Sequence, residues 1–115
     1  MESLNLNNND ISDISPLTAL DELKYLRISG SDLSGMADLS ALSAMTDLLY
    51  LEMNECEIES LSGLENLDSM EQLHLRGSEL PGANALVPLS GLEDLERLNL
   101  SESNIDDLTG LENLT

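Results

Sequence analysis

At 115 residues the chain forms one domain at most, and its formal net charge of −19, from 23 acidic and 4 basic residues, opposes binding to nucleic acid and to anionic membrane surfaces. It contains no Phe and no Trp, so its core is expected to consist of aliphatic side chains in thin layers. A single cysteine, Cys56, excludes an internal disulfide, and no apolar run is long enough to span a bilayer. No signal peptide follows Met1.

Aliphatic residues recur at every third position along most of the chain, as from Ile11 to Leu26 and from Leu33 to Leu51. Each run ends in a step of two, at Leu4-x-Leu6, Leu26-x-Ile28, Leu51-x-Met53, Leu73-x-Leu75 and Leu98-x-Leu100. A spacing of three matches neither the period of an α-helix, about 3.6 residues, nor the two-residue alternation of a strand. The step of two therefore predicts a short strand, and the triplets predict a coil that returns the chain to the next strand.

These steps divide the chain into five repeats, at residues 1–22, 23–47, 48–69, 70–94 and 95–115. The repeat lengths alternate between 22 and 25 residues before a last repeat of 21, because the longer repeats carry one additional triplet on the return side. The internal duplication is thus 47 residues long and relates Asn7 to Asn54 and Gly30 to Gly77. Self-similarity at a fixed period predicts a solenoid, here a single domain over residues 1–115.

Each repeat reads L-x-x-L-x-L-x-x-N-x-L, with Asn9, Ser31, Cys56, Ser78 and Ser103 at the ninth position. In this pattern the chain resembles the leucine-rich repeat family. Its 22-residue repeats are most similar to the internalin class, whereas the alternation with longer repeats is nearer to extracellular matrix leucine-rich proteoglycans. The resemblance implies an α/β solenoid, a right-handed horseshoe with five short parallel strands on the concave face and 3₁₀ or irregular turns on the convex face. The internalin likeness also implies a bacterial secreted or cell-surface protein.

In this family the ninth side chain points inward and bonds backbone groups in the turn, where buried amides need partners. We therefore interpret Cys56 as a small buried residue rather than a reactive thiol. On the return side we expect single 3₁₀ turns, because a 3₁₀ helix has about three residues per turn. They are expected at Ser15-Pro16-Leu17, Ser62-Gly63-Leu64, Ser90-Gly91-Leu92 and Thr109-Gly110-Leu111. The additional triplets at Leu39–Met45 and Leu86–Leu92 leave room for one turn of α-helix.

The resemblance also places the residues beside the strand leucines on the concave surface, in three columns. The first column is Ser3, Tyr25, Tyr50, Gln72 and Arg97; the second is Asn5, Arg27, Glu52, His74 and Asn99; the third is Asn7, Ser29, Asn54, Arg76 and Ser101. Most acidic residues fall elsewhere, so a neutral or mildly basic surface within an acidic shell is expected. Tyr and Arg are enriched at binding hot spots. The candidate partner-binding residues are Tyr25, Arg27, Tyr50, Glu52, Gln72, His74, Arg76 and Arg97.

Within this surface we expect Tyr25 and Tyr50 to form a flat aromatic platform, with Leu49 partly exposed beside it. A second interpretation needs no ligand: Tyr packs well on an exposed sheet face, and Arg27 and His74 offset the charge of Glu52. The sequence shows no nucleophile elbow, phosphate loop or His/Cys cluster with zinc spacing, so no catalytic or metal-binding residue and no cofactor is assigned. The turn acids Asp10, Asp13, Asp106 and Asp107 match no calcium-binding loop and are expected to be solvated.

Two functional hypotheses remain. The first is a non-enzymatic recognition module that binds a protein or peptide through the concave sheet. The second is an engineered or truncated repeat scaffold without a native ligand, which self-associates end to end because neither end carries a recognisable cap. In the second case the charge of −19 keeps such ends apart, and added salt promotes oligomers.

Overall fold

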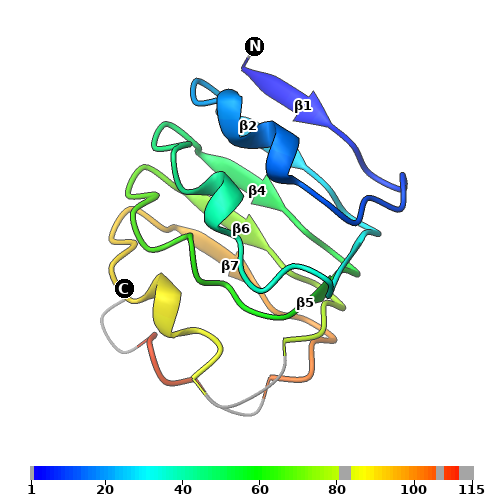
Figure 1. The fold of residues 1–115 in the computed structure, drawn as a ribbon. Coiled ribbons are helices and arrows are strands. Elements are labelled where there is room, and N and C mark those ends of the chain that lie inside the picture. Colours follow the sequence, from blue (N-terminus) through cyan, green and yellow to red (C-terminus); the bar gives the residue numbers. More distant parts are fainter. Residues whose placement is uncertain (1, 81–83, 106–107, 112–115) are drawn as a thin grey trace.

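The computed structural model describes residues 2–80, 84–105 and 108–111. Five short strands form one parallel sheet, and between strands the chain returns along the other side of the molecule (Figure 1). The strands are β1 (Ser3–Asn5), β2 (Tyr25–Arg27), β4 (Tyr50–Glu52), β6 (Gln72–His74) and β7 (Arg97–Asn99), and they lie side by side in that order. This arrangement confirms the predicted leucine-rich repeat solenoid.

The strand residues alternate between the core and the surface, as the step of two predicts. The middle residues of the central strands, Leu26, Leu51 and Leu73, are fully buried and pair in register with one another. Leu4 and Leu98 continue the same column at its two ends and are only partly buried. The core is therefore a stack of aliphatic layers in which each layer is covered by its neighbours.

The return coil explains the period of three. Along this coil, amides of buried aliphatic residues donate to the carbonyl of the aliphatic residue three positions earlier. The N–O distance is 2.9 Å from Leu42 to Leu39, 3.0 Å from Met45 to Leu42 and 3.0 Å from Leu48 to Met45. The other returns repeat this series of hydrogen-bonded turns. The coil thus satisfies its own backbone while directing every third side chain into the core.

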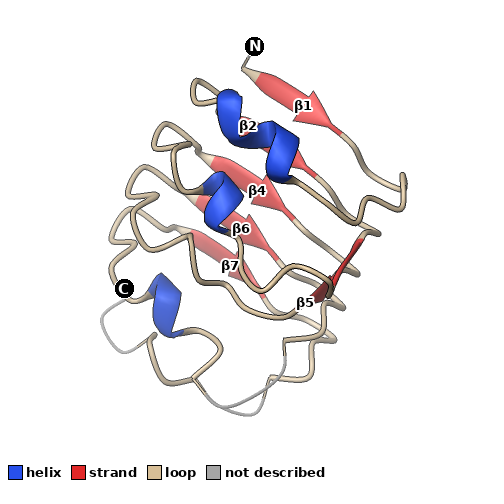
Figure 2. Ribbon diagram, viewed as in Figure 1, coloured by secondary structure: helices blue, strands red, loops and turns tan. Residues whose placement is uncertain are grey.

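Three returns contain short 3₁₀ helices on one side of the sheet, η1 (Ser15–Ala19), η2 (Ser40–Leu42) and η3 (Val87–Leu89) (Figure 2). The option of an α-turn at the additional triplets is wrong, because η2 and η3 form there instead. The 3₁₀ turn expected at Ser62-Gly63-Leu64 is also absent. Gly63 has a φ of +111°, which a right-handed helix cannot accommodate, and a Cβ atom there would lie 2.5 Å from the carbonyl oxygen of Leu39.

A second, two-stranded parallel sheet was not predicted. It pairs β3 (Asp32–Leu33) with β5 (Glu57–Ile58), and an isolated bridge joins Glu57 to Glu79. Its buried members, Leu33 and Ile58, begin the returns of their repeats. The regular stacking of repeats therefore brings a second segment of each into pairing distance beyond the main sheet.

The ninth-position side chains form a hydrogen-bonded series inside the turns, which we call the inner ladder. Cys56 Sγ donates to the Ile28 carbonyl at 3.2 Å, and Ser103 Oγ donates to the Leu75 carbonyl at 2.7 Å. Ser78 Oγ donates to the Met53 carbonyl and accepts from the Cys56 amide. These contacts confirm the inward orientation, and burial raises the pKa of the Cys56 thiol, as expected of an unreactive cysteine.

Asn9 is the exception in the ninth column. Its side chain is exposed and donates to the carbonyl of Asn7, two residues earlier in the same repeat, at 3.2 Å. In the inner ladder Cys56, Ser78 and Ser103 each reach a carbonyl of the preceding repeat, and no repeat precedes Asn9 in the structure. The inward contacts described for the ninth column are therefore those made by Cys and Ser to the preceding repeat.

One residue of each repeat turns the chain after the strand with a positive φ. The five are Asn8, Gly30, Glu55, Gly77 and Glu102. Glycine fits this conformation freely, whereas a glutamate costs about 1–2 kcal/mol there. The two longer repeats thus have an unstrained turn, and the third and fifth repeats carry local strain. No helix in the described ranges is long and apolar enough to cross a membrane.

Candidate functional site on the concave sheet

The strand register places the eight candidate residues on one surface. Tyr25, Tyr50, Gln72 and Arg97 pair consecutively in the first column, and Arg27, Glu52 and His74 pair consecutively in the second. Arg76 lies two residues beyond the end of β6. Tyr25, Arg27, Arg76 and Arg97 are exposed, whereas Tyr50, Glu52, Gln72 and His74 are partly buried. We call this set the concave surface.

Tyr50 lies at the centre of the concave surface and contacts three of its neighbours. The Cζ atom of Arg27 is 5.3 Å from the centre of the Tyr50 ring, within the range of a cation–π interaction. The ring of His74 is 5.1 Å away, tilted by 39°. The Tyr50 hydroxyl donates to Glu52 Oε1 at 3.0 Å. The ring therefore extends from the first column across the second.

The predicted platform of Tyr25 and Tyr50 is not formed through ring contact, although the two residues pair in register. The ring contact in the described part of the chain is between Tyr50 and His74, with no ring contact between Tyr25 and Tyr50. Tyr25 is 45% exposed and remains available to solvent. Leu49 is partly exposed, as predicted.

Glu52 is held as a carboxylate by hydrogen bonds. Its Oε2 accepts from Asn7 Nδ2 and from Ser29 Oγ, both at 2.9 Å, while Oε1 accepts from Tyr50. Partial burial opposes the charge, but these bonds, with a smaller attraction from Arg27, outweigh it and hold the pKa of Glu52 below its ordinary value. Hydrogen bonds, rather than an ion pair with Arg27 or His74, therefore stabilise the charged Glu52 side chain on the concave surface.

The third column forms a second hydrogen-bonded series, which we call the outer ladder. Asn7 Oδ1 accepts from the Ser29 amide at 2.8 Å, Ser29 Oγ accepts from the Asn54 amide at 3.0 Å, and Asn54 Oδ1 accepts from the Arg76 amide at 2.8 Å. Sequence reasoning missed this series, although short polar residues at three successive positions of the column were its signal.

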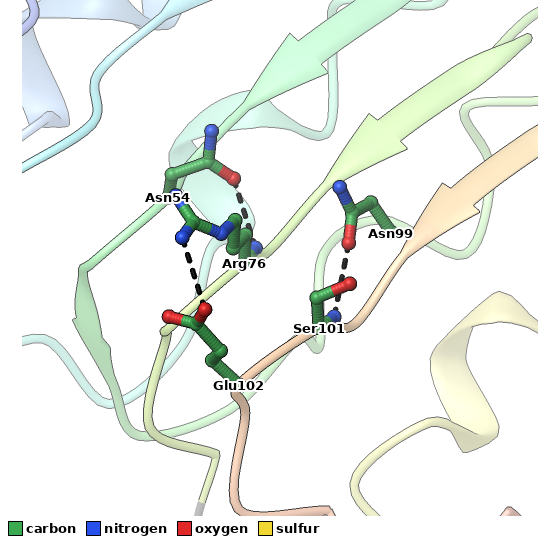
Figure 3. Close-up of polar contacts among 5 residues, drawn as sticks. All are labelled: Asn54, Arg76, Asn99, Ser101 and Glu102. Carbon is green, nitrogen blue, oxygen red and sulfur yellow. Dashed lines mark hydrogen bonds and ion pairs between the residues drawn. The ribbon is translucent and has the colours of Figure 1, made fainter.

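The outer ladder stops at Arg76, because a guanidinium group has no acceptor to offer. The Ser101 amide donates instead to Asn99 Oδ1 in its own strand, at 2.9 Å (Figure 3). Arg76 Nη2 contacts Glu102 Oε1 at 3.0 Å, and both side chains are more than half exposed, so this ion pair adds little stability. Arg76 thus stands where the ladder would favour Asn or Ser.

Other chemistry was sought in the described residues. They contain no cluster of three His, Cys, Asp or Glu side chains placed to hold a metal ion, while Asp106 and Asp107 lie outside them. A cavity of about 530 Å³ lies between the third and fourth repeats, lined in part by Leu61, Leu80 and Val87. None of the candidate residues lines it.

Comparison with known proteins decides the family. A model of leucine-rich repeats, in two copies, matches residues 1–44. An internalin (inlF) from Listeria monocytogenes superimposes with a TM-score of 0.86 at 32% identity over 100% of this chain. The chain is an internalin-like leucine-rich repeat protein. Internalin C2 (inlC2) from the same organism gives a TM-score of 0.87 at 26% identity, again over the full chain.

The internalin-like chain spans 33% of the first internalin structure and 48% of the second. The ectodomain of the plant receptor kinase GASSHO1/SCHENGEN3 from Arabidopsis thaliana shares the fold, with a TM-score of 0.65 at 22% identity over 89% of this chain and 12% of the receptor structure; it was solved in complex with CASPARIAN STRIP INTEGRITY FACTOR 2. No curated protein sequence matches the chain significantly. Leucine-rich repeats of this kind are typically non-enzymatic, and their fold commonly mediates protein–protein recognition.

Proposed function

We propose that this internalin-like protein is a non-enzymatic recognition module that binds a protein or peptide through its concave surface. The observation that carries the proposal is the preassembled cluster of Arg27, Tyr50, Glu52 and His74, which is ordered by its own contacts before any ligand arrives. Side chains already held in place lose little conformational entropy on binding. Such a surface is suited to rigid presentation rather than to catalysis.

The exposed residues around this cluster are the ones that would contact a partner. Tyr25 combines a large apolar ring with a hydroxyl group, and it pairs with Tyr50 in the first column. Arg97 is exposed on β7, at the far side of the cluster. Tyr and Arg carry a large share of the binding energy in measured interfaces. We therefore assign Tyr25 and Arg97 as anchors, and Tyr50, Glu52 and His74 as their support.

The test is selection of binders from a displayed library of random peptides, using the full chain as bait. The comparison variant carries Tyr25→Ala, whose ring makes no ring contact in the described structure and whose loss leaves the cluster intact. Enriched peptides are expected to lose about tenfold or more in affinity for the variant. A matched control carries Ser43→Ala and Thr46→Ala, two exposed residues of a return coil. Binders that ignore Tyr25 and respond to the control substitutions would overturn the assignment.

A second candidate, self-association, is favoured by the outer layers. Leu4, Leu6, Leu98 and Leu100 are only partly buried, and Leu108 is 62% exposed. β1 and β7 are the edges of the main sheet, each with one unpaired side. If these faces associate, screening the charge of −19 with salt increases the mass measured by light scattering after size exclusion. A monomer at both low and high salt would contradict it.

A further inference from the structure

Two arginines of the concave surface have no carboxylate partner. Where the structure describes the chain, the ion pairs are Lys24 with Glu2, at 3.9 Å, and Arg76 with Glu102, at 3.0 Å. Arg27 stacks on the Tyr50 ring instead, and Arg97 forms no ion pair. Unpaired guanidinium groups are unexpected in a chain with 23 acidic residues and only four Lys and Arg.

The one acid of the concave columns, Glu52, lies opposite Arg27 in the strand register and attracts it, but the two form no ion pair. Both Glu52 oxygens are occupied by hydrogen bonds from Asn7, Ser29 and Tyr50. Arg27 and Arg97 therefore present positive charge outward from an otherwise acidic molecule, on a surface already ordered by the Tyr50 cluster. The scarce positive charge of the chain is concentrated where a partner would dock.

The spacing of the two arginines defines what they can bind. Arg27 is on β2 and Arg97 on β7, with β4 and β6 between them, so three strand intervals separate them. At about 4.8 Å per interval, and with Arg97 offset from Arg27 by two residues along the strand direction, the separation of their Cα atoms is about 16 Å. Four residues of an extended peptide cover most of this distance, the long arginine side chains cover the rest, and residues four apart point to the same side. Two carboxylates at positions i and i+4 would reach both arginines.

The flanks of the concave surface add a second requirement. Glu71 and Glu96 directly precede β6 and β7, and Asp32, Glu57 and Glu79 line the second sheet beyond the ends of the strands; all five are exposed. A wholly acidic ligand would be repelled by these edges and by the net charge. A ligand that carries basic residues in addition to its acidic pair would be attracted to both parts of the surface.

We propose that the partner presents an extended segment with two carboxylates four residues apart, one bound by Arg27 and one by Arg97, and that this segment also carries basic residues. This inference rests on the proposed function of the concave surface and specifies the chemistry of its partner. Carboxylates bind guanidinium groups through paired N–H···O bonds, which form only when the acid lies in a well-defined position. Arginines that do not first have to leave a carboxylate partner are suited to this task.

The experiment sequences the peptides that the full chain selects from a random displayed library. Binders are expected to be enriched in Asp or Glu at positions i and i+4, with Lys or Arg at other positions of the peptide. Selected peptides are then measured against Arg97→Gln and Arg27→Lys, each expected to lower affinity about tenfold, the first by removing the charge and the second by removing the planar fork. The matched control is Lys24→Gln, which removes a charge outside the columns and leaves affinity within about twofold.

The outcomes separate this inference from the proposed function. Peptides that require Tyr25 but carry no acidic pair, and that bind Arg97→Gln as well as the original chain, would overturn the acidic-pair inference while the recognition function stands. Peptides that are insensitive to Tyr25, Arg27 and Arg97 alike would overturn both. If Lys24→Gln and Arg97→Gln lowered the affinity for the selected peptides equally, the effect would come from net charge rather than from the position of Arg97. That result would also refute the inference. Thermal unfolding of each variant checks that the fold is retained.

Discussion

The inner and outer ladders use the same chemistry with different results. In the inner ladder Cys56 and Ser78 are fully buried, and every buried side-chain N or O atom of the described residues has a hydrogen-bond partner. In the outer ladder the polar column is interrupted at Arg76, an exposed residue that offers no acceptor. Water can replace a missing bond on the surface but not in the core. The core therefore restricts which residues are allowed, whereas the concave surface leaves positions free to vary.

The strongest test of this contrast is Ser78→Ala in the inner ladder. The substitution leaves the buried Cys56 amide and the Met53 carbonyl without partners, so the free energy of unfolding should fall by about 1–3 kcal/mol. Urea unfolding followed by circular dichroism measures this. Cys56→Ser is the matched control, because a hydroxyl retains a donor to the Ile28 carbonyl, and it should change stability by about 0.5 kcal/mol or less. A Ser78→Ala protein as stable as the original would contradict the contrast.

A smaller loss is expected from Asn54→Ala in the outer ladder. The Arg76 amide loses its acceptor, but it lies at an exposed position where water substitutes, so the cost should be about 0.5 kcal/mol. Ser101→Ala controls for the loss of a polar side chain, since only its amide takes part in the hydrogen bond to Asn99. If Asn54→Ala destabilises as much as Ser78→Ala, exposure is not what distinguishes the two ladders.

The smallest effect is expected from Arg76→Asn, which would repair the outer ladder. An amide oxygen at this position can accept from the Ser101 amide, as Asn54 does for Arg76, and only an exposed ion pair is lost. We expect a gain of about 0.3 kcal/mol, measured as a small rise in Tm. A loss of stability would show that the pair with Glu102 contributes more than its exposure suggests.

The positions of the main strands and of the concave columns could be predicted residue by residue, because a buried leucine column allows only one register. The contacts of Tyr50 could not, since they depend on a side-chain rotation that brings its hydroxyl to Glu52. The pairing of Asp32 with Glu57 was missed for a different reason. Two-residue strands have no alternation to detect, and they pair only because neighbouring repeats already stand in register.

Predictions for the return coils failed where the local backbone conformation, rather than the spacing of apolar residues, determines the type of turn. The positive φ of Gly63 excludes the expected 3₁₀ turn, and the sequence Ser-Gly-Leu does not specify the sign of φ. Glu55 and Glu102 occupy positions where their equivalents Gly30 and Gly77 would have suggested glycine. Contacts between stacked repeats impose these positive φ values, so the local sequence alone does not predict them. Partner binding by the concave surface stays a prediction.

The series of hydrogen-bonded turns has a consequence for how repeats of unequal length coexist. Before β4, turn bonds join Leu39, Leu42, Met45 and Leu48; before β6, they join Leu61, Leu64, Leu67 and Met70. The longer repeat adds its extra residues upstream, as one more turn from Leu33 to Met36, and not within Leu39–Met45, where the additional triplet was expected. An insertion of three residues therefore leaves every later side chain facing as before, whereas one or two would rotate the remaining leucines out of the core. Repeat length can change only in whole turns, so the strands remain aligned while the opposite face varies in size.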